Sequence, residues 1–357
     1  MHIQKRINSL LTKRIQTSVL VLTLFSLCYM VYVHSEGLIQ LRLEKPSEEF
    51  NDFLQLHELD ETDLSKSENI FFIESSGSKI GSSDIGDLKK RDSCCIESAA
   101  LMNPDSRIRV IFVSRLKLNI SEFVKSLLNY ENVAFHRINL KDVTKDTIAE
   151  EWINSEKIYN TSFIPNNISN FLRLFLLWKY GGTYLDLDVI SLSSINTIGE
   201  DNFITVEEKS TLNNAIIRFD SMSTGHTLAE TLLRDFMESY DGRRWGHNGP
   251  NLVTRVLKTF CEFPNVFPEE KFNCSGVTIL PKKMCSEIFY KEVKQLFSED
   301  PEVLENTLGR LEDSHLIHLY NLFSRGLKVK TNSKTAIIEI AKDQCPIVLS
   351  NSGDYFD

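Results

Sequence analysis

The stretch ISNFLRLFLLWKYGGTYLDLDVISL, residues 168–192, decides the fold that we expect. Its first half is apolar on nearly every side, which predicts a buried helix. Gly181 and Gly182 then end that helix, because glycine tolerates the left-handed conformation that follows many helix C-termini. Residues 183–190 alternate in polarity, and this period of two predicts a strand.

The predicted strand carries two carboxylates on one face. Tyr184, Asp186 and Asp188 point to the same side, and the residues between them point into the sheet. Carboxylates at the end of an otherwise apolar strand are costly to bury without a partner. Mg²⁺ or Mn²⁺ is a suitable partner, because both bind carboxylates together with diphosphate oxygens. The D-x-D triplet therefore predicts a metal site, and a solvated strand end is the alternative for such a triplet taken alone.

Arg173 lies in the apolar half of this stretch, between Leu172 and Leu174. An unpaired guanidinium is costly in such surroundings. One interpretation is a structural ion pair with one of the two aspartates, and the other is a contact to a phosphate or a sugar. The sequence leaves both open.

Strands and helices alternate along the chain before this stretch. Apolar runs that end in turn residues predict three strands, NIFFIESS (69–76), RVIFVS (109–114) and NVAFHRIN (132–139). Helices are expected in ESAALMNP (97–104) and ISEFVKSLLNY (120–130). This alternation predicts a parallel, doubly wound α/β sheet, in which ligands bind at the carboxyl ends of the strands.

The composition is that of a chain with a sizeable core. The 357 residues are 42% hydrophobic and 25% charged, which excludes a wholly disordered or collagen-like protein. The length suits one large domain or two ordinary ones. A net charge of −9 argues against nucleic acid as the main partner, because phosphate binding requires concentrated Lys and Arg.

The N-terminal segment differs in character from the rest. Residues 15–33 contain no charged side chain, and this run is about as long as a bilayer core is thick, at roughly 30 Å. Basic residues precede the run and acidic residues follow it. The positive-inside rule therefore predicts a cytosolic tail (1–14), a transmembrane signal anchor (15–33) and a lumenal remainder. A cleaved signal peptide is the alternative, whereas a buried core helix would not have such asymmetric flanks.

Residues 34–66 are expected to form an acidic lumenal stem, and residues 67–357 the globular catalytic domain. The stem offers too little apolar surface to offset the entropy lost on ordering. A weak amphipathic pattern favours a short helix there as the alternative. Its apolar positions are Phe50, Phe53, Leu54 and Leu56.

Sequons and cysteines agree with a lumenal location. N-x-S/T triplets begin at Asn119, Asn160, Asn167 and Asn273. Six of the seven cysteines follow the predicted anchor, and an even number in an oxidising lumen favours disulfides. Zinc is the alternative, but the chain has no C-x-x-C and no H-x-x-x-H pair. Cys261 and Cys274 are expected to close a local loop.

In the stretch that contains Arg173 and the two aspartates, the chain resembles a known family. The pattern R-x-x-x-L-x-x-x-G-G-x-Y-x-D-x-D, from Arg173 to Asp188, is similar to that of D-x-D sugar-nucleotide transferases with a glycosyltransferase-A (Rossmann-like) fold. The resemblance to the α1,4-glycosyltransferase family is closer and extends from about residue 69 to residue 345. It includes FFIESS, CIESAALMNPDS, WKYGGTYLDLDVISL, LNNAIIRF, WGHNGPNLVTRV, CSGVTILP and HLIHLYN.

The resemblance implies a single-pass type II enzyme of the Golgi membrane that uses a UDP-sugar with Mn²⁺ or Mg²⁺. The implied reaction is retaining transfer of galactose or N-acetylgalactosamine, in α1,4 linkage, to a glycolipid or glycan terminus such as lactosylceramide, in glycosphingolipid biosynthesis. Retention through a covalent intermediate requires a well-placed carboxylate; the sequence names none, and a front-face mechanism is equally allowed. The alternatives are a D-x-D enzyme with another donor, such as an α-mannosyltransferase using GDP-mannose, and an inactive lumenal binding protein that has kept the fold.

The resemblance also implies roles for individual residues. Asp188 would ligate the metal, Asp186 would contact the ribose or the metal-bound water, and Arg173 would lie against the donor sugar or phosphates. His318 corresponds to a C-terminal histidine that completes the metal and diphosphate site, with a hydrogen-bonded core histidine as the alternative. Tyr184 is counted on the donor side, although core packing is the simpler role for it.

Two further segments belong to the implied site. Asn213 and Asn214 match the segment that meets the donor sugar or the acceptor. His247 lies in WGHNGP, a segment that matches a region around the acceptor. Because functional residues concentrate on loops, His247 is a candidate catalytic residue, and a surface or capping histidine is the alternative.

The chain departs from the family's pattern at three places. Asn170 stands where many relatives carry Asp, and the missing charge would weaken or redirect the choice of donor. Tyr320 replaces a common Trp, which would alter the acceptor side. Cys95 and Cys285 look like additions to the usual set, and a bond between them is one option.

Overall fold

The computed structural model describes residues 53–357, except 60–63, 65–67, 80, 263–265 and 268. The predicted tail and anchor and most of the predicted stem lie outside these residues. Among the helices of the described part, none is long and apolar enough to cross a bilayer.

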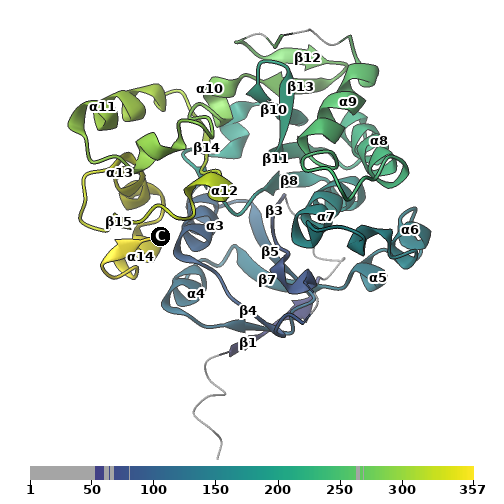
Figure 1. Ribbon diagram of the computed structural model, residues 1–357, viewed down its shortest axis with the longest axis horizontal. Helices are drawn as coiled ribbons and strands as arrows, with labels where there is room; N and C mark the ends of the chain where they lie inside the picture. Colours follow the sequence, from purple (N-terminus) through teal and green to yellow (C-terminus); the bar gives the residue numbers. More distant parts are fainter. Residues whose placement is uncertain (1–52, 60–63, 65–67, 80, 263–265, 268) are drawn as a thin grey trace, which may run out of the picture. The chain divides into compact units, whose positions relative to one another are not determined.

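A nine-stranded sheet forms the centre of the fold (Figure 1), in the order β12-β13-β10-β11-β8-β3-β5-β7-β2. In chain order, its strands are β2 His57–Glu58, β3 Asn69–Glu74, β5 Arg107–Val113, β7 Val133–Ile138, β8 Gly182–Leu185, β10 Phe203–Glu208, β11 Thr211–Phe219, β12 Phe272–Cys274 and β13 Val277–Leu280. The three strands predicted before the Gly pair are confirmed as β3, β5 and β7, and they pair in parallel.

The prediction of a wholly parallel sheet is wrong for one half. Strand β11 runs antiparallel to both β8 and β10. Only residues 209 and 210 separate β10 from β11, and a connection that short forms a hairpin, because a parallel pair requires a long crossover. The sheet is therefore mixed.

Smaller sheets complete the strand set. They contain β1 Phe53–Gln55 with β6 Lys117–Asn119 and β4 Ile85–Gly86, β9 Val189–Ser191 with β14 Leu316–His318, and β15 Val329–Lys330 with β16 Tyr355–Phe356. Strands β1 and β2 lie within the predicted stem, and Leu56 between them is buried. The described positions of the apolar pattern, Phe53, Leu54 and Leu56, thus belong to β1 and to the residue that follows it rather than to a helix, whereas Phe50 lies outside the described residues.

Helices cover both faces of the sheet, as the doubly wound prediction requires. The helices are α3 Lys90–Met102, α4 Glu122–Leu127, α5 Leu140–Val143, α6 Glu150–Asn154, α7 Ile164–Tyr180, α8 Thr224–Glu238, α9 Pro250–Phe260, α10 Lys282–Cys285, α11 Pro301–Arg310, α12 Asn321–Ser324, α13 Ala336–Gln344 and α14 Pro346–Ser350. One core contains apolar residues of α7, α8 and α9, and the other contains those of α3, α4, α13 and α14. The two groups are separate in Figure 1.

Helix α7 is the buried helix that the sequence predicts. Its apolar residues from Phe171 to Leu177 are 2% exposed or less. The helix ends at Gly181, which has φ 66°, and Gly182 follows with φ 97°. A Cβ on Gly182 would lie 2.6 Å from the carbonyl oxygen of Asn69 in β3. Both the backbone conformation and the close packing therefore require glycine here.

The predicted strand 183–190 is interrupted at the two aspartates. Strand β8 ends at Leu185 and β9 begins at Val189, and a turn between them is closed by a hydrogen bond from the Val189 amide to the Asp186 carbonyl at 3.0 Å. Strand β9 leaves the main sheet and pairs with β14. Asp186 and Asp188 therefore lie where the chain passes from one sheet to another.

The described part of the chain contains two disulfides, Cys94–Cys345 and Cys261–Cys274. The second confirms the predicted local loop. The suggested bond between Cys95 and Cys285 is wrong, because both are free and buried. Cys94 faces the junction of α13 and α14, and Cys95 points about 100° further around α3.

The four sequons differ in accessibility. Asn160 and Asn273 are exposed, and Asn119 is partly buried. Asn167 lies in α7, is 5% exposed and accepts a hydrogen bond from Asn248 at 3.0 Å. The folded domain therefore leaves no room for a glycan at Asn167.

Candidate metal centre

The D-x-D aspartates lie where β8 ends, at the carboxyl edge of the parallel strands. Asp186 and Asp188 meet His318, the last residue of β14, and ligand atoms of the three side chains lie within 4.8 Å of one another. Two carboxylates and an imidazole form a donor set that suits a divalent cation. The predicted metal-ligand set is thus brought together from segments about 130 residues apart.

Asp188 is held by the C-terminal segment of the chain. Its Oδ1 lies 3.1 Å from His318 Nε2, and its Oδ2 accepts a hydrogen bond from the Asn321 amide at 2.7 Å. The Asp188 carbonyl accepts from the Leu319 amide at 2.8 Å. Burial alone would raise the pKa of Asp188, but His318 and the Asn321 amide outweigh it and lower the pKa. The side chain is therefore an anion at neutral pH.

His318 is fixed on three sides. Its Nδ1 lies 3.4 Å from Asn213 Nδ2, and its ring stacks on Tyr320 with centroids 3.9 Å apart. Burial would lower the pKa of His318, but the charge and hydrogen bond of Asp188 raise it overall. Tyr320 has φ 47°, a left-handed conformation that bulky residues seldom adopt, and this bend turns the chain from β14 into α12.

Asp186 is held from the helix side by Arg173. Arg173 Nη2 lies 3.0 Å from Asp186 Oδ1, and the Tyr184 hydroxyl donates to the same oxygen. The other guanidinium nitrogens donate to the backbone carbonyls of Ser169 and Asn214, at 3.2 and 2.6 Å. Arg173 therefore makes the structural ion pair of the first interpretation, and its contact to a phosphate or a sugar remains a prediction.

Tyr184 combines core packing with this positioning. The residue is 1% exposed, and its ring centroid lies 4.3 Å beneath the Arg173 guanidinium. Burial raises the pKa of the Tyr184 hydroxyl well above its ordinary value. It therefore stays protonated and serves as a hydrogen-bond donor to Asp186.

Asn170 belongs to the same neighbourhood. Its Oδ1 accepts a hydrogen bond from Asn214 Nδ2 at 2.8 Å. A Cβ on Gly249 would lie 3.0 Å from Asn214 Nδ2 and 3.2 Å from Asn170 Nδ2. The WGHNGP segment thus packs against the two asparagines, and Asn213 contacts His318 on the other side. The structure joins these predicted residues into one site.

His247 has a different setting from the other predicted residues. One of its ring nitrogens, Nε2, hydrogen-bonds the Ser239 carbonyl at 2.9 Å, and its own carbonyl accepts from Arg255 at 2.8 Å. In the described part of the chain, no hydrogen bond or ion pair joins His247 to Asp186 or Asp188. These contacts hold the loop before α9, and a catalytic role for His247 remains a prediction.

Two carboxyl groups that sequence reasoning missed lie in the electrostatic field of the site. Burial raises the pKa of Glu207, and Asp186 raises it further while His318 opposes the rise. Burial also raises the pKa of Asp92 to about 7, with a contribution from Asp188. The position of Glu207 depends on an irregularity between Val206 and Glu208 in the β10–β11 pairing, which no sequence pattern reveals.

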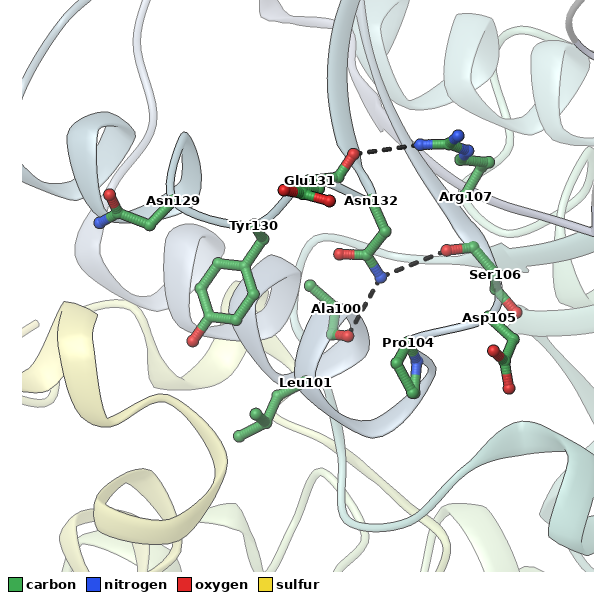
Figure 2. Close-up of a pocket in the computed structure, with 10 residues that line it drawn as sticks. All are labelled: Ala100, Leu101, Pro104, Asp105, Ser106, Arg107, Asn129, Tyr130, Glu131 and Asn132. Carbon is green, nitrogen blue, oxygen red and sulfur yellow. Dashed lines mark hydrogen bonds between the residues drawn. The ribbon is translucent and has the colours of Figure 1, made fainter.

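A cavity of about 500 Å³ lies at the opposite edge of the sheet. Figure 2 shows its lining residues, of which Ser106 and Asn132 precede β5 and β7 at the amino ends of these strands. The Asn132 amide donates to the carbonyls of Ala100 and Ser106 and is thus occupied by the backbone. This cavity does not include the Asp186, Asp188 and His318 cluster, so it is not the metal centre.

Comparison with known proteins gives two family matches. A model described as the α1,4-glycosyltransferase conserved region matches residues 221–352, and a model of the glycosyltransferase sugar-binding region containing the DXD motif matches residues 89–204. The second match includes α7 and both aspartates. It supports the expected glycosyltransferase-A-like α/β fold with a D-x-D region.

Similar proteins carry related names. Lactosylceramide 4-alpha-galactosyltransferase of Mus musculus is 30% identical over 284 residues, which are 78% of this chain and 74% of that protein. Alpha-1,4-N-acetylglucosaminyltransferase of Homo sapiens is 28% identical over 265 residues, 71% of this chain and 74% of that protein. The solved galactosyltransferase LgtC, with donor and acceptor sugar analogues, is 14% identical and covers 71% of this chain and 87% of its own, with a TM-score of 0.35.

Proposed function

The chain belongs to the α1,4-glycosyltransferase family, and we propose that it transfers galactose or N-acetylgalactosamine from a UDP-sugar, with retention, in α1,4 linkage to a glycolipid or glycan terminus. The observation that carries this proposal is the cluster of Asp186, Asp188 and His318 at the carboxyl edge of the strands. The names of the similar galactosyltransferases support the choice of sugar.

We infer that Asp188 and His318 hold Mn²⁺ or Mg²⁺, with Asp186 completing the site. The three side chains fit a divalent cation, because Asp188 is kept anionic and the ligand atoms of all three lie within 4.8 Å of one another. When bound, the cation supplies charge that stabilises the departing diphosphate. Arg173 and Tyr184 orient the Asp186 carboxylate, and Asn213 orients the His318 ring.

On the donor side, we assign Asn170 and Asn214 to the transferred sugar. Their side-chain amides are hydrogen-bonded to each other, and the Arg173 guanidinium donates to the backbone carbonyl of Asn214. Amide groups suit sugar hydroxyls because each amide offers both donors and an acceptor.

The proposed location is the Golgi membrane, with residues 53–357 in the lumen. Support comes from the predicted signal anchor at residues 15–33 and from the two disulfides, which form and persist in oxidising compartments.

A donor panel tests the proposed function. The full chain, purified in detergent with Mn²⁺ and lactosylceramide, would be assayed with UDP-galactose, UDP-N-acetylgalactosamine, UDP-N-acetylglucosamine and GDP-mannose. Turnover of either of the first two supports the proposal. Turnover of UDP-N-acetylglucosamine alone would assign to the chain the activity for which the human alpha-1,4-N-acetylglucosaminyltransferase is named. Turnover of GDP-mannose alone, or of no donor, would replace the proposal with a different transferase or with an inactive binding protein.

The variant Asn170→Asp is expected to lower the KM for the donor by about three- to tenfold, because an ionised acceptor makes stronger hydrogen bonds than an amide oxygen. It retains the oxygen that accepts from Asn214. Steady-state kinetics with each donor measures the effect. Asn129→Asp is the matched control, since it adds the same charge to an exposed position by the cavity at the opposite edge. A KM unchanged for every donor would remove Asn170 from the donor site.

A further inference from the structure

Trp245 is an exposed aromatic residue on a surface loop. It is 54% exposed, whereas Trp152 and Trp178 are partly buried. Trp152 stacks on Phe171 of the core, and Trp178 packs at a tilt against Phe175. Its ring makes one edge-to-face contact with Phe163, with centroids 5.1 Å apart. A large aromatic surface therefore remains open to solvent, and such surfaces dominate the energetics of many interfaces.

The loop that carries Trp245, residues 239–249, is held firmly. Asn248 closes it, because its side chain accepts from the Asp241 amide at 3.1 Å and donates to the Asp241 carbonyl at 3.0 Å. Asn248 also donates to Asn167 of α7 at 3.0 Å, and Thr161 donates to the Gly242 carbonyl at 2.6 Å. Trp245 is thus presented in a fixed position, which reduces the entropy lost when a ligand binds.

The loop follows one face of α7 toward the metal centre. Phe163, Asn167, Asn170 and Arg173 are spaced by four, three and three residues, so they lie along one side of the helix. The partners along this row follow in the same order. Trp245 contacts Phe163, Asn248 hydrogen-bonds Asn167, Gly249 lies beside Asn170, and Asp186 pairs with Arg173. Phe163 caps the helix seven residues before Asn170, which is about 10 Å at 1.5 Å per residue. Asn167, Arg173 and Asn248 are buried in these contacts, so the row is the line along which the loop is fixed to α7. It sets the exposed Trp245 about 10 Å along the helix from Asn170 of the proposed donor-sugar site, which is roughly the length of two sugar residues.

We propose that Trp245 is the platform on which the acceptor glycan stacks its second sugar, counted from the sugar that receives the transfer. This inference rests on the proposed function. A pyranose ring has an apolar face of C–H groups, and stacking that face on an indole removes both surfaces from water. The exposed guanidinium groups of Arg243 and Arg244, next to the tryptophan, can donate hydrogen bonds to sugar hydroxyls.

A lipid surface is the competing partner for an exposed Trp beside two Arg residues, because such residues are also found at membrane interfaces. The row along α7 favours the glycan. It places Trp245 in line with Asn170 and Arg173, whereas a contact to lipid would not require that alignment.

The test compares soluble and lipid-linked acceptors. With the full chain in detergent, Trp245→Ala is expected to raise the KM for lactose by about tenfold or more, the loss typical of truncating an aromatic residue that the bound partner covers. Trp245→Phe should retain part of the affinity, and galactose, which has no second sugar, should show no effect of either variant. Tyr355→Ala is the control, because it removes an exposed aromatic ring from β16.

Three results would overturn the proposal. The first is an unchanged KM for lactose in Trp245→Ala. The second is an effect confined to lactosylceramide, which would assign Trp245 to the lipid. The third is an equal effect with galactose and lactose.

A binding measurement separates this proposal from the proposed function. Trp245 is the exposed one of the chain's three tryptophans, so iodide quenching of fluorescence reports mainly on it. Lactose or N-acetyllactosamine should protect the wild type from quenching, and the quenchable fraction should be absent in Trp245→Phe. Protection without turnover of any donor would support the platform while contradicting the proposed reaction. The absence of protection by either saccharide would contradict the platform.

Discussion

Asp188→Asn is expected to abolish sugar transfer while leaving the fold intact. We expect kcat to fall by about 10³-fold, equivalent to roughly 4 kcal/mol of lost transition-state stabilisation. The substitution removes the anion that His318 and the Asn321 amide keep ionised. The side-chain oxygen of Asn can still accept from that amide, so the C-terminal segment should remain in place.

Three measurements characterise this variant. Transfer kinetics give kcat, electron paramagnetic resonance of free Mn²⁺ gives the affinity for the cation, and the thermal midpoint checks the fold. The pKa of His318 should also fall in the variant, because the charge of Asp188 contributes to raising it. Asp105→Asn is the matched control, since it makes the same change at an exposed position by the opposite cavity. Full activity of Asp188→Asn with unchanged Mn²⁺ affinity would remove Asp188 from the metal centre.

Arg173→Met is expected to destabilise the folded domain by about 3–5 kcal/mol, the usual cost of removing one partner of a buried ion pair. The Asp186 carboxylate would lose its cation, and the carbonyls of Ser169 and Asn214 would lose their donors. The free energy of unfolding in urea, followed by circular dichroism, measures the effect.

Two further variants give this prediction its controls. Arg173→Lys retains the charge but cannot make the same fork of hydrogen bonds, so an intermediate loss is expected. Arg107→Met removes an exposed guanidinium that makes one hydrogen bond, to the Glu131 carbonyl, and should cost little. If Arg173→Met were no more destabilising than Arg107→Met, the guanidinium would not be the group that holds this part of the site together.

The local features of the fold were predictable because their causes are local. An all-apolar helix, two glycines and an alternating run lie within residues 168–192, and helix α7, the glycine termination and the D-x-D position follow from them. The strands β3, β5 and β7 were recognisable because each is a short apolar run that ends in turn residues.

The remaining features depend on partners far away in the chain. The turn at residues 186–188 exists because β9 pairs with β14, more than 120 residues later. His318 entered the predicted site through the family resemblance, since its own surroundings, SHLIHLYN, also suit a core histidine. The ion pair of Arg173 depends on the position of Asp186, which the glycine turn sets. The position of Glu207 depends on the register of the β10–β11 hairpin.

The C-terminal segment that holds Asp188 has a consequence for the timing of synthesis. A ribosome that has reached residue 300 has already made the D-x-D turn, Arg173 and both asparagines, but the nascent chain still has neither His318 nor the Asn321 amide. The cation site is therefore assembled only after these residues have been added. The bond from Cys345 back to Cys94 then joins α3 to the C-terminal helices that pack beside it. In the proposed lumenal setting, competence to bind the proposed donor is expected to arise late in biogenesis, when almost the whole domain has been made and its long-range disulfide can form.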